Sequence, residues 1–339
     1  MKKSISLLLV LVSSFQAIAQ VDSTKEASSA PNHSTTFTYY VDGYYKSDFA
    51  GKPENNKTSF TNSSNTFQIG MASVKLDQVL GNFSATLDLG VGKRAEEFSY
   101  NDNGVATSFK QAFISYAPNS TVKFTAGKWA THVGYELLDT YSNRNYSMSY
   151  GFSYGPFFHT GVRADIALAG KSAMMIGVAQ PTDFVSSSSP NKMIIAQFST
   201  GTKNDRLKAF LNYQGGKSKS QVDLVLNGVV SSQVAINYDG TVCNISGASW
   251  TSNAFYVNYD PSAKFGFTWR SEYFDDSKNA AGVGTSIFQN TLSANIHFDK
   301  FTLIPEIRFD NAKDKIFFNN NNNLNPFAGN FLLAAIYKF

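Results

Sequence analysis

The stretch Gly329–Phe339, GNFLLAAIYKF, decides the fold class of this chain. Its apolar and aromatic residues recur at every second position, and side chains at alternate positions of a β-strand share one face. That face consists of Phe331, Leu333, Ala335, Tyr337 and Phe339. This pattern is typical of the closing strand of an outer-membrane β-barrel, which presents one face to lipid and places aromatic rings at the membrane boundary. A terminal strand of a soluble sandwich would alternate in the same way, so the other end of the chain matters.

The N-terminus has the pattern of a secretory signal peptide. Lys2 and Lys3 precede an apolar stretch over residues 5–12, and Ala17-Ile18-Ala19 forms a small-x-small cleavage site. Cleavage after residue 19 would leave Gln20 first, so the sequence predicts an exported protein without a lipid anchor. Residues 20–35 are predicted to form a short disordered periplasmic leader, and residues 36–339 the barrel domain.

Composition supports a membrane barrel. Aromatic residues make up 14% of the chain and charged residues only 16%, whereas soluble domains carry about a quarter charged residues. After residue 19 no apolar run approaches the roughly 20 residues that a membrane helix needs. Such a chain enters a bilayer only as a closed barrel, because an open sheet would leave backbone groups unpaired in lipid. Removal of two lysines with the signal peptide lowers the formal net charge of +4, so the basic pI does not indicate nucleic-acid binding.

Alternating segments of about ten residues recur between turn residues along the whole chain. They predict an all-β, transmembrane, antiparallel up-and-down barrel of about 16 strands, with 14 to 18 as the range and a water-filled lumen. The predicted strands are 36–48, 64–77, 82–95, 107–117, 121–129, 157–169, 172–181, 190–200, 205–215, 219–227, 231–239, 249–260, 264–275, 285–299, 301–311 and 328–339.

The predicted connections alternate in length, as barrels with short periplasmic turns and long outer loops require. The long ones include 49–63, 96–106, 130–156, 240–248, 276–284 and 312–327, and only the step at 215–218 is short where a long loop is expected. The single cysteine, Cys243, falls in 240–248, so we expect a loop thiol with no chemical role.

The polar faces of the predicted strands identify candidate wall residues of the lumen. Charged side chains oppose lipid-facing aromatic and aliphatic ones near the middle of several strands, which predicts an aqueous channel. The candidates are Arg163, Asp165, Arg206, Lys208, Arg270, Glu272, Glu306, Arg308 and Asp310. Since the charges nearly balance, we expect weak ion selectivity.

The longest connection, 130–156, is the candidate for a constriction loop. In general porins the third long loop folds into the lumen, and carboxylates on such a loop facing arginines on the wall would create a transverse field. The candidate residues are Glu136, Asp139, Tyr141, Arg144 and Tyr146. Two alternatives remain open: an exposed surface loop, or a loop whose tyrosines stack on sugar rings.

The stretch 127–164, GKWATHVGYELLDTYSNRNYSMSYGFSYGPFFHTGVRA, resembles the putative β-barrel porin family described as OmpL-like. The similar features are a GK-aromatic strand end, GYE, an Asn-rich tyrosine-serine run and P-hydrophobic-H-T-G-V-R, and TYYVDGYY at 38–45 resembles the family's opening strand. The resemblance implies an outer-membrane porin of a Gram-negative bacterium, without catalytic residues and without an assigned solute.

An enzyme is disfavoured by the histidines. His159 and Asp165 lie six residues apart on one predicted strand, about 20 Å at the rise of a strand, beyond hydrogen-bond reach. No nucleophile is marked by its neighbours, and the histidine spacing gives no metal site. We therefore expect no enzymatic activity, no metal and no cofactor.

The sequence therefore predicts an outer-membrane porin for passive diffusion of small hydrophilic solutes. The alternative is a non-conducting barrel that acts as a surface adhesion or structural protein. Expected partners are outer-membrane lipid, the solutes, and the barrel-assembly machinery, which would bind the C-terminal strand. A homotrimer is a further hypothesis, by analogy with general porins.

Overall fold

The computed structural model describes residues 33–339. The predicted signal peptide and most of the predicted leader lie outside this range. The first strand begins at His33, three residues before its predicted start.

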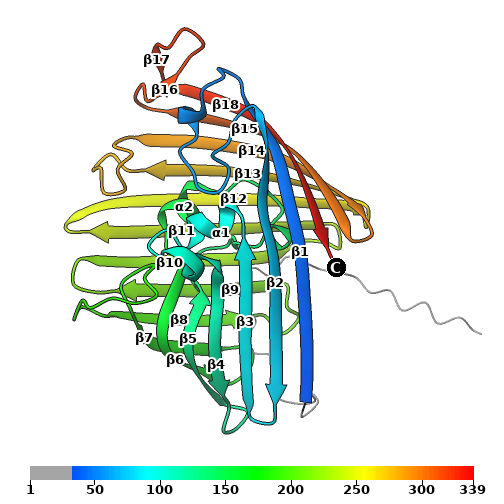
Figure 1. Cartoon of the computed structure of the whole chain (residues 1–339), viewed down its shortest axis with the longest axis vertical. Helices are drawn as coiled ribbons and strands as arrows, with labels where there is room; N and C mark the ends of the chain where they lie inside the picture. Colours follow the sequence, from blue (N-terminus) through cyan, green and yellow to red (C-terminus); the bar gives the residue numbers. More distant parts are fainter. Residues whose placement is uncertain (1–32) are drawn as a thin grey trace, which may run out of the picture.

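Sixteen antiparallel strands close into a single barrel (Figure 1). The strands are β1 (His33–Asp48), β2 (Thr66–Leu80), β3 (Phe83–Val91), β4 (Phe109–Tyr116), β5 (Val122–Ala130), β6 (Phe158–Ala167), β7 (Ala173–Ala179), β8 (Met193–Gly201), β9 (Leu207–Gly215), β10 (Lys219–Val229), β11 (Val234–Ile245), β12 (Ala248–Ser262), β13 (Phe265–Asp275), β14 (Ser286–Phe298), β15 (Phe301–Ala312) and β18 (Phe327–Lys338). Each predicted strand overlaps one of these, so the predicted fold class and the count of 16 are confirmed.

The barrel is closed by the pairing of β1 with β18. The register runs from Tyr40 opposite Lys338 to Asp48 opposite Asn330. Beyond it, Tyr39 and Phe339 exchange backbone hydrogen bonds of 3.2 and 3.0 Å, and their rings stack with centroids 5.4 Å apart. This pairing leaves no sheet edge, which a membrane-spanning sheet requires.

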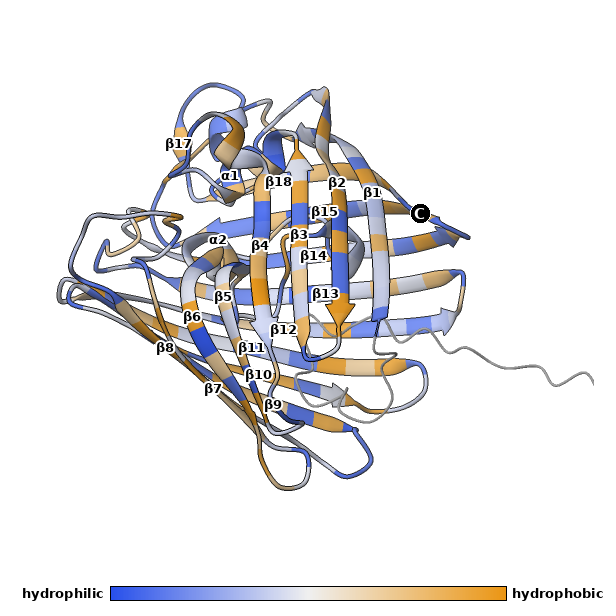
Figure 2. Ribbon diagram, turned by 60° about the horizontal axis from the view of Figure 1, so that its bottom comes forward, coloured by the Kyte–Doolittle hydropathy of each residue, from blue (hydrophilic) through white to orange (hydrophobic). Residues whose placement is uncertain are grey.

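The two faces of the wall differ as the sequence predicts, and hydropathy alternates along the strands in Figure 2. Large apolar side chains such as Trp269 and Phe331 are exposed on the outer face. Their polar strand neighbours, such as Arg270 and Asn330, are buried on the inner face. The alternate residues of the C-terminal motif, from Phe331 to Phe339, all point outward, and each is exposed or half-buried.

The connections at one end of the barrel are tight turns, and those at the other end include longer loops. The long loops contain short elements of their own, and no helix among residues 33–339 is long and apolar enough to cross a membrane. These elements are η1 (Pro53–Asn55), α1 (Lys93–Phe98), η2 (Gly104–Ser108), η3 (Thr140–Ser142), α2 (Tyr150–Tyr154) and the hairpin of β16 (Phe317–Phe318) with β17 (Leu324–Asn325). Helix α1 replaces the end of the strand predicted at 82–95.

The prediction of a long loop at 240–248 is wrong. Strand β11 continues to Ile245, β12 begins at Ala248, and only Ser246 and Gly247 lie between them. Both turn residues have positive φ, 51° and 92°, as a two-residue hairpin turn requires. The segment is rich in polar residues because its strand faces a polar interior, so polarity there does not indicate a loop.

Cys243 is consequently a wall residue and not a loop thiol. It lies in β11 opposite Trp250 of β12 and is fully buried. Its neighbours Trp250 and Phe274 belong to the same cluster of buried residues. This environment removes the sulfur from solvent.

We expect Cys243 to react with a maleimide only after the barrel unfolds. Labelling of the folded protein should be slow because the thiol is fully buried, and labelling in denaturant should be complete. A Cys243→Ser, Ser232→Cys variant, whose thiol lies in the exposed turn between β10 and β11, should react rapidly in the folded state. Equal rates at the two positions would contradict the burial of Cys243.

Candidate functional site

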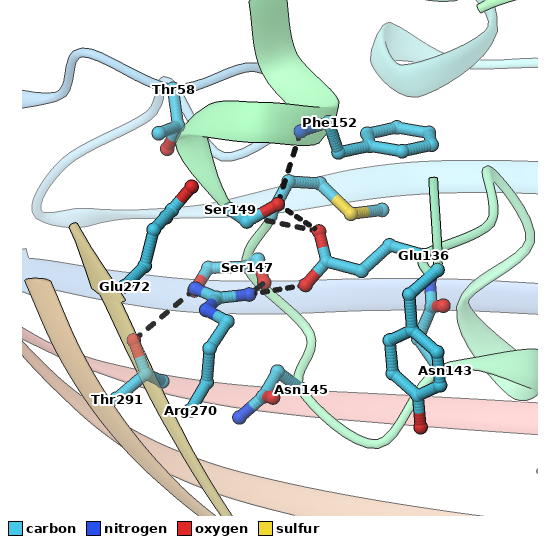
Figure 3. Close-up of polar contacts among 12 residues, drawn as sticks. Thr58, Glu136, Asn143, Asn145, Ser147, Ser149, Phe152, Arg270, Glu272 and Thr291 are labelled. Carbon is cyan, nitrogen blue, oxygen red and sulfur yellow. Dashed lines mark hydrogen bonds and ion pairs between the residues drawn. The ribbon is translucent and has the colours of Figure 1, made fainter. Parts of the chain in front are cut away.

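The connection between β5 and β6, residues 131–157, is bonded to side chains from many strands of the inner face. It contains η3 and α2, and its backbone and side chains meet polar residues that the sequence places on the wall. Figure 3 shows the centre of these contacts, where β13 faces the loop. The contacts are of several kinds: ion pairs, carboxylates that accept from backbone N–H groups, and a guanidinium group that donates to a carbonyl oxygen.

A buried ion pair joins the loop to β13. The Arg270 guanidinium donates to Glu136 Oε1 at 2.5 Å and to the Ser147 carbonyl oxygen at 2.7 Å. The other Glu136 oxygen accepts from the backbone N–H and the hydroxyl of Ser149, both at 2.8 Å. Arg270 is 0% exposed. Since a buried charge without its partner is strongly destabilising, both residues depend on the loop conformation.

Two wall carboxylates each accept two consecutive backbone N–H groups of the loop. Glu306 accepts from Tyr146 at 2.9 Å and from Ser147 at 3.2 Å. Glu272 accepts from Tyr150 at 2.8 Å and from Gly151 at 2.7 Å. These carboxylates satisfy donors that have no strand partner, two of them at the start of α2, where helical N–H groups are always unpaired.

Arg308 holds the same loop segment through a carbonyl group. It donates to the Met148 carbonyl oxygen at 2.8 Å and lies over the Tyr150 ring, 5.1 Å from its centroid. Asp310 accepts from the same guanidinium at 3.0 Å and orients it. The loop segment 146–151 therefore contacts β13 and β15 at nearly every residue.

The loop also contacts β1 and β4, which lie on the other side of the β1–β18 junction from β13 and β15. Asp42 accepts from the Thr140 hydroxyl at 2.6 Å and from the Tyr146 hydroxyl at 2.9 Å. Asp139 forms a 2.6 Å ion pair with Lys110, which also lies 3.0 Å from Asp88.

Two further loop residues reach the end of the barrel that carries the tight turns. The Arg144 guanidinium makes two contacts with the Asp260 carboxylate and donates to the Thr268 hydroxyl at 2.8 Å. The ring of Tyr141 packs edge-on against Tyr40 and lies under the Lys338 ammonium group, 4.1 Å from the ring centroid.

The predicted wall residues thus fall into two groups. Arg270, Glu272, Glu306 and Arg308 contact the loop directly, and Asp310 does so through Arg308. The others lie elsewhere. Arg163 and Asp165 form a half-buried 3.4 Å ion pair on β6, Lys208 is half-buried on β9, and Arg206 lies exposed in the turn before β9, where it donates to the Val230 carbonyl.

Sequence reasoning missed several residues that bind the loop. Asp42, Lys110 and Asp260 alternate with apolar neighbours on their strands, so a search for inward charges on every strand could have found them. Arg94 falls at the end of the strand predicted at 82–95, but the strand ends at Val91, so strand alternation does not describe its surroundings. It lies in α1, fully buried, and donates to the carbonyl groups of Leu138 and Tyr146 at 3.4 and 3.3 Å.

Two of the histidines, His132 and His159, form a buried pair. The rings of His132 and His159 lie 4.9 Å apart, and burial lowers the pKa of His132 in the loop to about 4, so it is neutral at neutral pH. Among residues 33–339 no group of three or more His, Cys, Asp or Glu side chains could hold a metal ion.

The carboxylate of Asp183 links other loops to the end of loop 131–157. Asp183, in the connection between β7 and β8, accepts from the backbone N–H groups of Phe157 and Phe158 at 2.7 and 3.0 Å and from the Tyr100 hydroxyl at 3.1 Å. Burial raises the pKa of Asp183 to about 6, against the opposing effect of these donors.

The comparisons with known proteins agree with this architecture. The sequence matches the family described as "Putative beta-barrel porin-2, OmpL-like" over residues 34–339. The chain belongs to this porin family. No curated protein matches its sequence.

Solved outer-membrane channels share the fold at low sequence identity. The channel DcaP of Acinetobacter baumannii has a TM-score of 0.60 at 11% identity, covering 91% of this chain and 97% of that one. The trimer form of OmpT from Vibrio cholerae has 0.58 at 12%, covering 91% and 99%. An anion-selective porin from Comamonas acidovorans has 0.57 at 12%, covering 91% and 100%.

Replacing Glu306 with alanine should loosen the loop. The change leaves the N–H groups of Tyr146 and Ser147 without acceptors, at about 1–3 kcal/mol for each buried group. Hydrogen exchange measured by mass spectrometry should become faster in peptides that cover 144–150. Glu54→Ala, at an exposed loop position, is the control. Unchanged exchange in Glu306→Ala would show that the carboxylate does not hold the loop.

Asp183 should make the stability of the barrel depend on pH. Its carboxyl group binds a proton more tightly when folded than when unfolded, where its pKa is about 3.9. The resulting stabilisation is complete below about pH 4 and is lost as the pH rises to about 6. Compared with Asp183→Asn, the parent protein should therefore lose stability over this range.

The urea concentration at the midpoint of unfolding in detergent micelles, measured between pH 4 and 7, tests the direction of this change in stability. Asp299→Asn, in the turn between β14 and β15, controls for general effects of acid. A parent protein that gains stability relative to Asp183→Asn as the pH rises would contradict the prediction.

Proposed function

We propose that this protein is an outer-membrane porin through which small hydrophilic solutes diffuse, and that loop 131–157 narrows its lumen. The observation that carries the proposal is the binding of the loop backbone by Glu272 and Glu306, which lie on the inner face of strands far from β5 and β6 in sequence. Family membership and the fold of solved channels support the transport role.

The charges around the loop favour weak ion selectivity. Glu136 pairs with Arg270, Asp139 with Lys110, and Arg144 with Asp260. A paired charge presents little net field to a passing ion, so the transverse field expected between a loop and its wall is largely cancelled. Size is then the main criterion by which solutes would be sorted.

One observation favours the alternative of a non-conducting barrel. Arg270, Glu272 and Gln289 are 0% exposed, and Arg308 and Glu306 are nearly as buried. Wall residues opposite the loop therefore have almost no contact with water in this conformation. A loop that stays in this position would restrict flow strongly, and the barrel would then act as an adhesion or structural protein.

Single-channel conductance of the refolded mature protein in a planar bilayer distinguishes these functions. The test variant lacks residues 137–150. We expect steady currents from the parent protein and a higher conductance from the variant, because the deletion removes the segments bonded to β1, β13 and β15. The control replaces the exposed residues 320–323, at the tip of the β16–β17 hairpin, with a Gly-Ser linker of the same length and should conduct like the parent protein.

The other outcomes have distinct meanings. A silent parent protein and a conducting deletion variant would indicate a barrel closed by its loop. Silence in both, with folding confirmed by circular dichroism, would contradict the porin function and favour the adhesion or structural role.

The same proposal includes assembly in the outer membrane. The exposed C-terminal face from Phe331 to Phe339 would be recognised by the barrel-assembly machinery, after export directed by the signal peptide. A homotrimer is also proposed, since the OmpT structure with a similar fold is described as a trimer.

A further inference from the structure

Two aspartates on neighbouring strands of the inner face lie directly against loop 131–157. Asp223 of β10 and Asp239 of β11 are 1% and 6% exposed. Asp223 Oδ1 accepts from the backbone N–H of Gly134 at 3.0 Å, and Asp239 Oδ2 accepts from that of Tyr135 at 2.9 Å. Consecutive loop residues therefore bind the two carboxyl groups, which we call the aspartate pair.

The bonding of the aspartate pair requires a proton. The two side chains are hydrogen-bonded to each other, and such a bond needs a proton on one of the two carboxyl groups. Asp223 Oδ2 is buried, and no N–H group of residues 33–339 donates to it. A protonated Asp239 supplies the missing donor. Since two carboxylates in contact repel each other and cannot both be ionised in a buried site, the pair holds one proton while the loop is in place.

The side chains around the aspartate pair do not compensate for a second negative charge. The titratable groups that face it are Tyr135 and Glu136 of the loop, Tyr238 of β11 and Tyr256 of β12. None of these forms a cation, and Glu136 is already paired with Arg270.

The neighbouring strands supply no close cation either. On β9 the neutral amide group of Asn212 donates to Asp223 Oδ1 at 2.5 Å. The lysines of β9 and β10, Lys208 and Lys219, each lie four residues along their strand from this position, about 13 Å at the rise of a strand. Ionisation of both aspartates is therefore unfavourable unless water reaches them.

The bonded loop segment leads directly into the ion pair between the loop and β13. Glu136 follows Tyr135 in the chain and binds both Arg270 and Ser149. The ring of Tyr135 packs against that of Tyr256, with centroids 4.4 Å apart. Movement of Gly134 and Tyr135 away from the aspartates would pull on these contacts, so a change at the aspartate pair would loosen a larger part of the loop.

We propose that the aspartate pair is a pH-dependent switch that holds loop 131–157 in the lumen at low pH and releases it as the pH rises. The closed state buries the pair with its shared proton, whereas movement of the loop admits the water that stabilises two carboxylates. Because the closed state binds the proton more tightly, loss of the proton favours the open state. The inference rests on the proposed function in one respect, namely that release of the loop widens the lumen.

Hydrogen exchange measured by mass spectrometry tests the switch without any need for a current. The measured quantity is the protection factor, which corrects each amide for the effect of pH on its intrinsic exchange rate. Peptides within 132–138 of the refolded mature protein are followed in detergent micelles. We expect their protection factors to fall about tenfold between about pH 5 and about pH 9, within the usual range of coupling between two sites.

The matched variant is Asp239→Asn. Its amide group can donate to Asp223 Oδ2, and its carbonyl oxygen can accept from the N–H of Tyr135, so it mimics the protonated pair at every pH. Its protection factors should stay high across the whole range. Asp223→Asn also leaves a single carboxyl group and should behave in the same way. Asp299→Asn, at an exposed turn position, should show the same fall as the parent protein.

Conductance in planar bilayers at the same pH values separates this inference from the proposed function. Currents that rise with pH in the parent protein but not in Asp239→Asn would support both. Lower protection at high pH without a rise in current would support the switch and contradict the narrowing of the lumen by the loop.

Two results would overturn the switch. The first is a parent protein whose protection factors within 132–138 do not change with pH. The second is a fall of the parental size in folded Asp239→Asn or Asp223→Asn protein. Circular dichroism and heat-modifiable electrophoretic mobility identify a variant that failed to fold.

Discussion

Backbone hydrogen bonding inside a membrane is the constraint on which the rest of the structure depends. No backbone group that faces lipid can remain unpaired, so sixteen strands must form a closed ladder, and β1 must meet β18. The loop 131–157 brings further backbone groups against the inner face without a strand beside it. Its N–H groups need acceptors, and Glu272 and Glu306 supply them. The same requirement therefore determines the closed ladder of the wall and the position of charges within it.

This requirement changes the meaning of the charged residues on the wall. A charge in a lumen suggests contact with ions in transit, yet Arg270 and Glu306 are engaged with the loop and are nearly inaccessible to water. The inward charges that keep more exposure, such as Asp77 at 36% of its side chain, lie toward the tight turns. The interior is therefore divided into a region that holds the loop and a region that meets solvent.

Much of the barrel could be predicted from the sequence because strand periodicity is local. Alternation located all sixteen strands, and the outward face from Phe331 to Phe339 followed directly. It failed at Cys243, since a polar strand that faces a polar interior has the composition of a loop. The candidate site was only partly predictable. Periodicity identifies Glu272 as inward, but its two partners in the loop, Tyr150 and Gly151, are set by how a long loop folds, and no local pattern specifies that.

The loop contacts strands on both sides of the β1–β18 junction, and this has a mechanical consequence. Asp42 on β1 and Glu306 on β15 both bind Tyr146, one through the hydroxyl group and the other through the backbone N–H. The last strand, β18, lies between β15 and β1 in the sheet. Pulling β1 away from β18 would therefore strain the bonds of a single loop residue as well as the ladder. The loop acts as an internal cross-brace against lateral opening of the barrel.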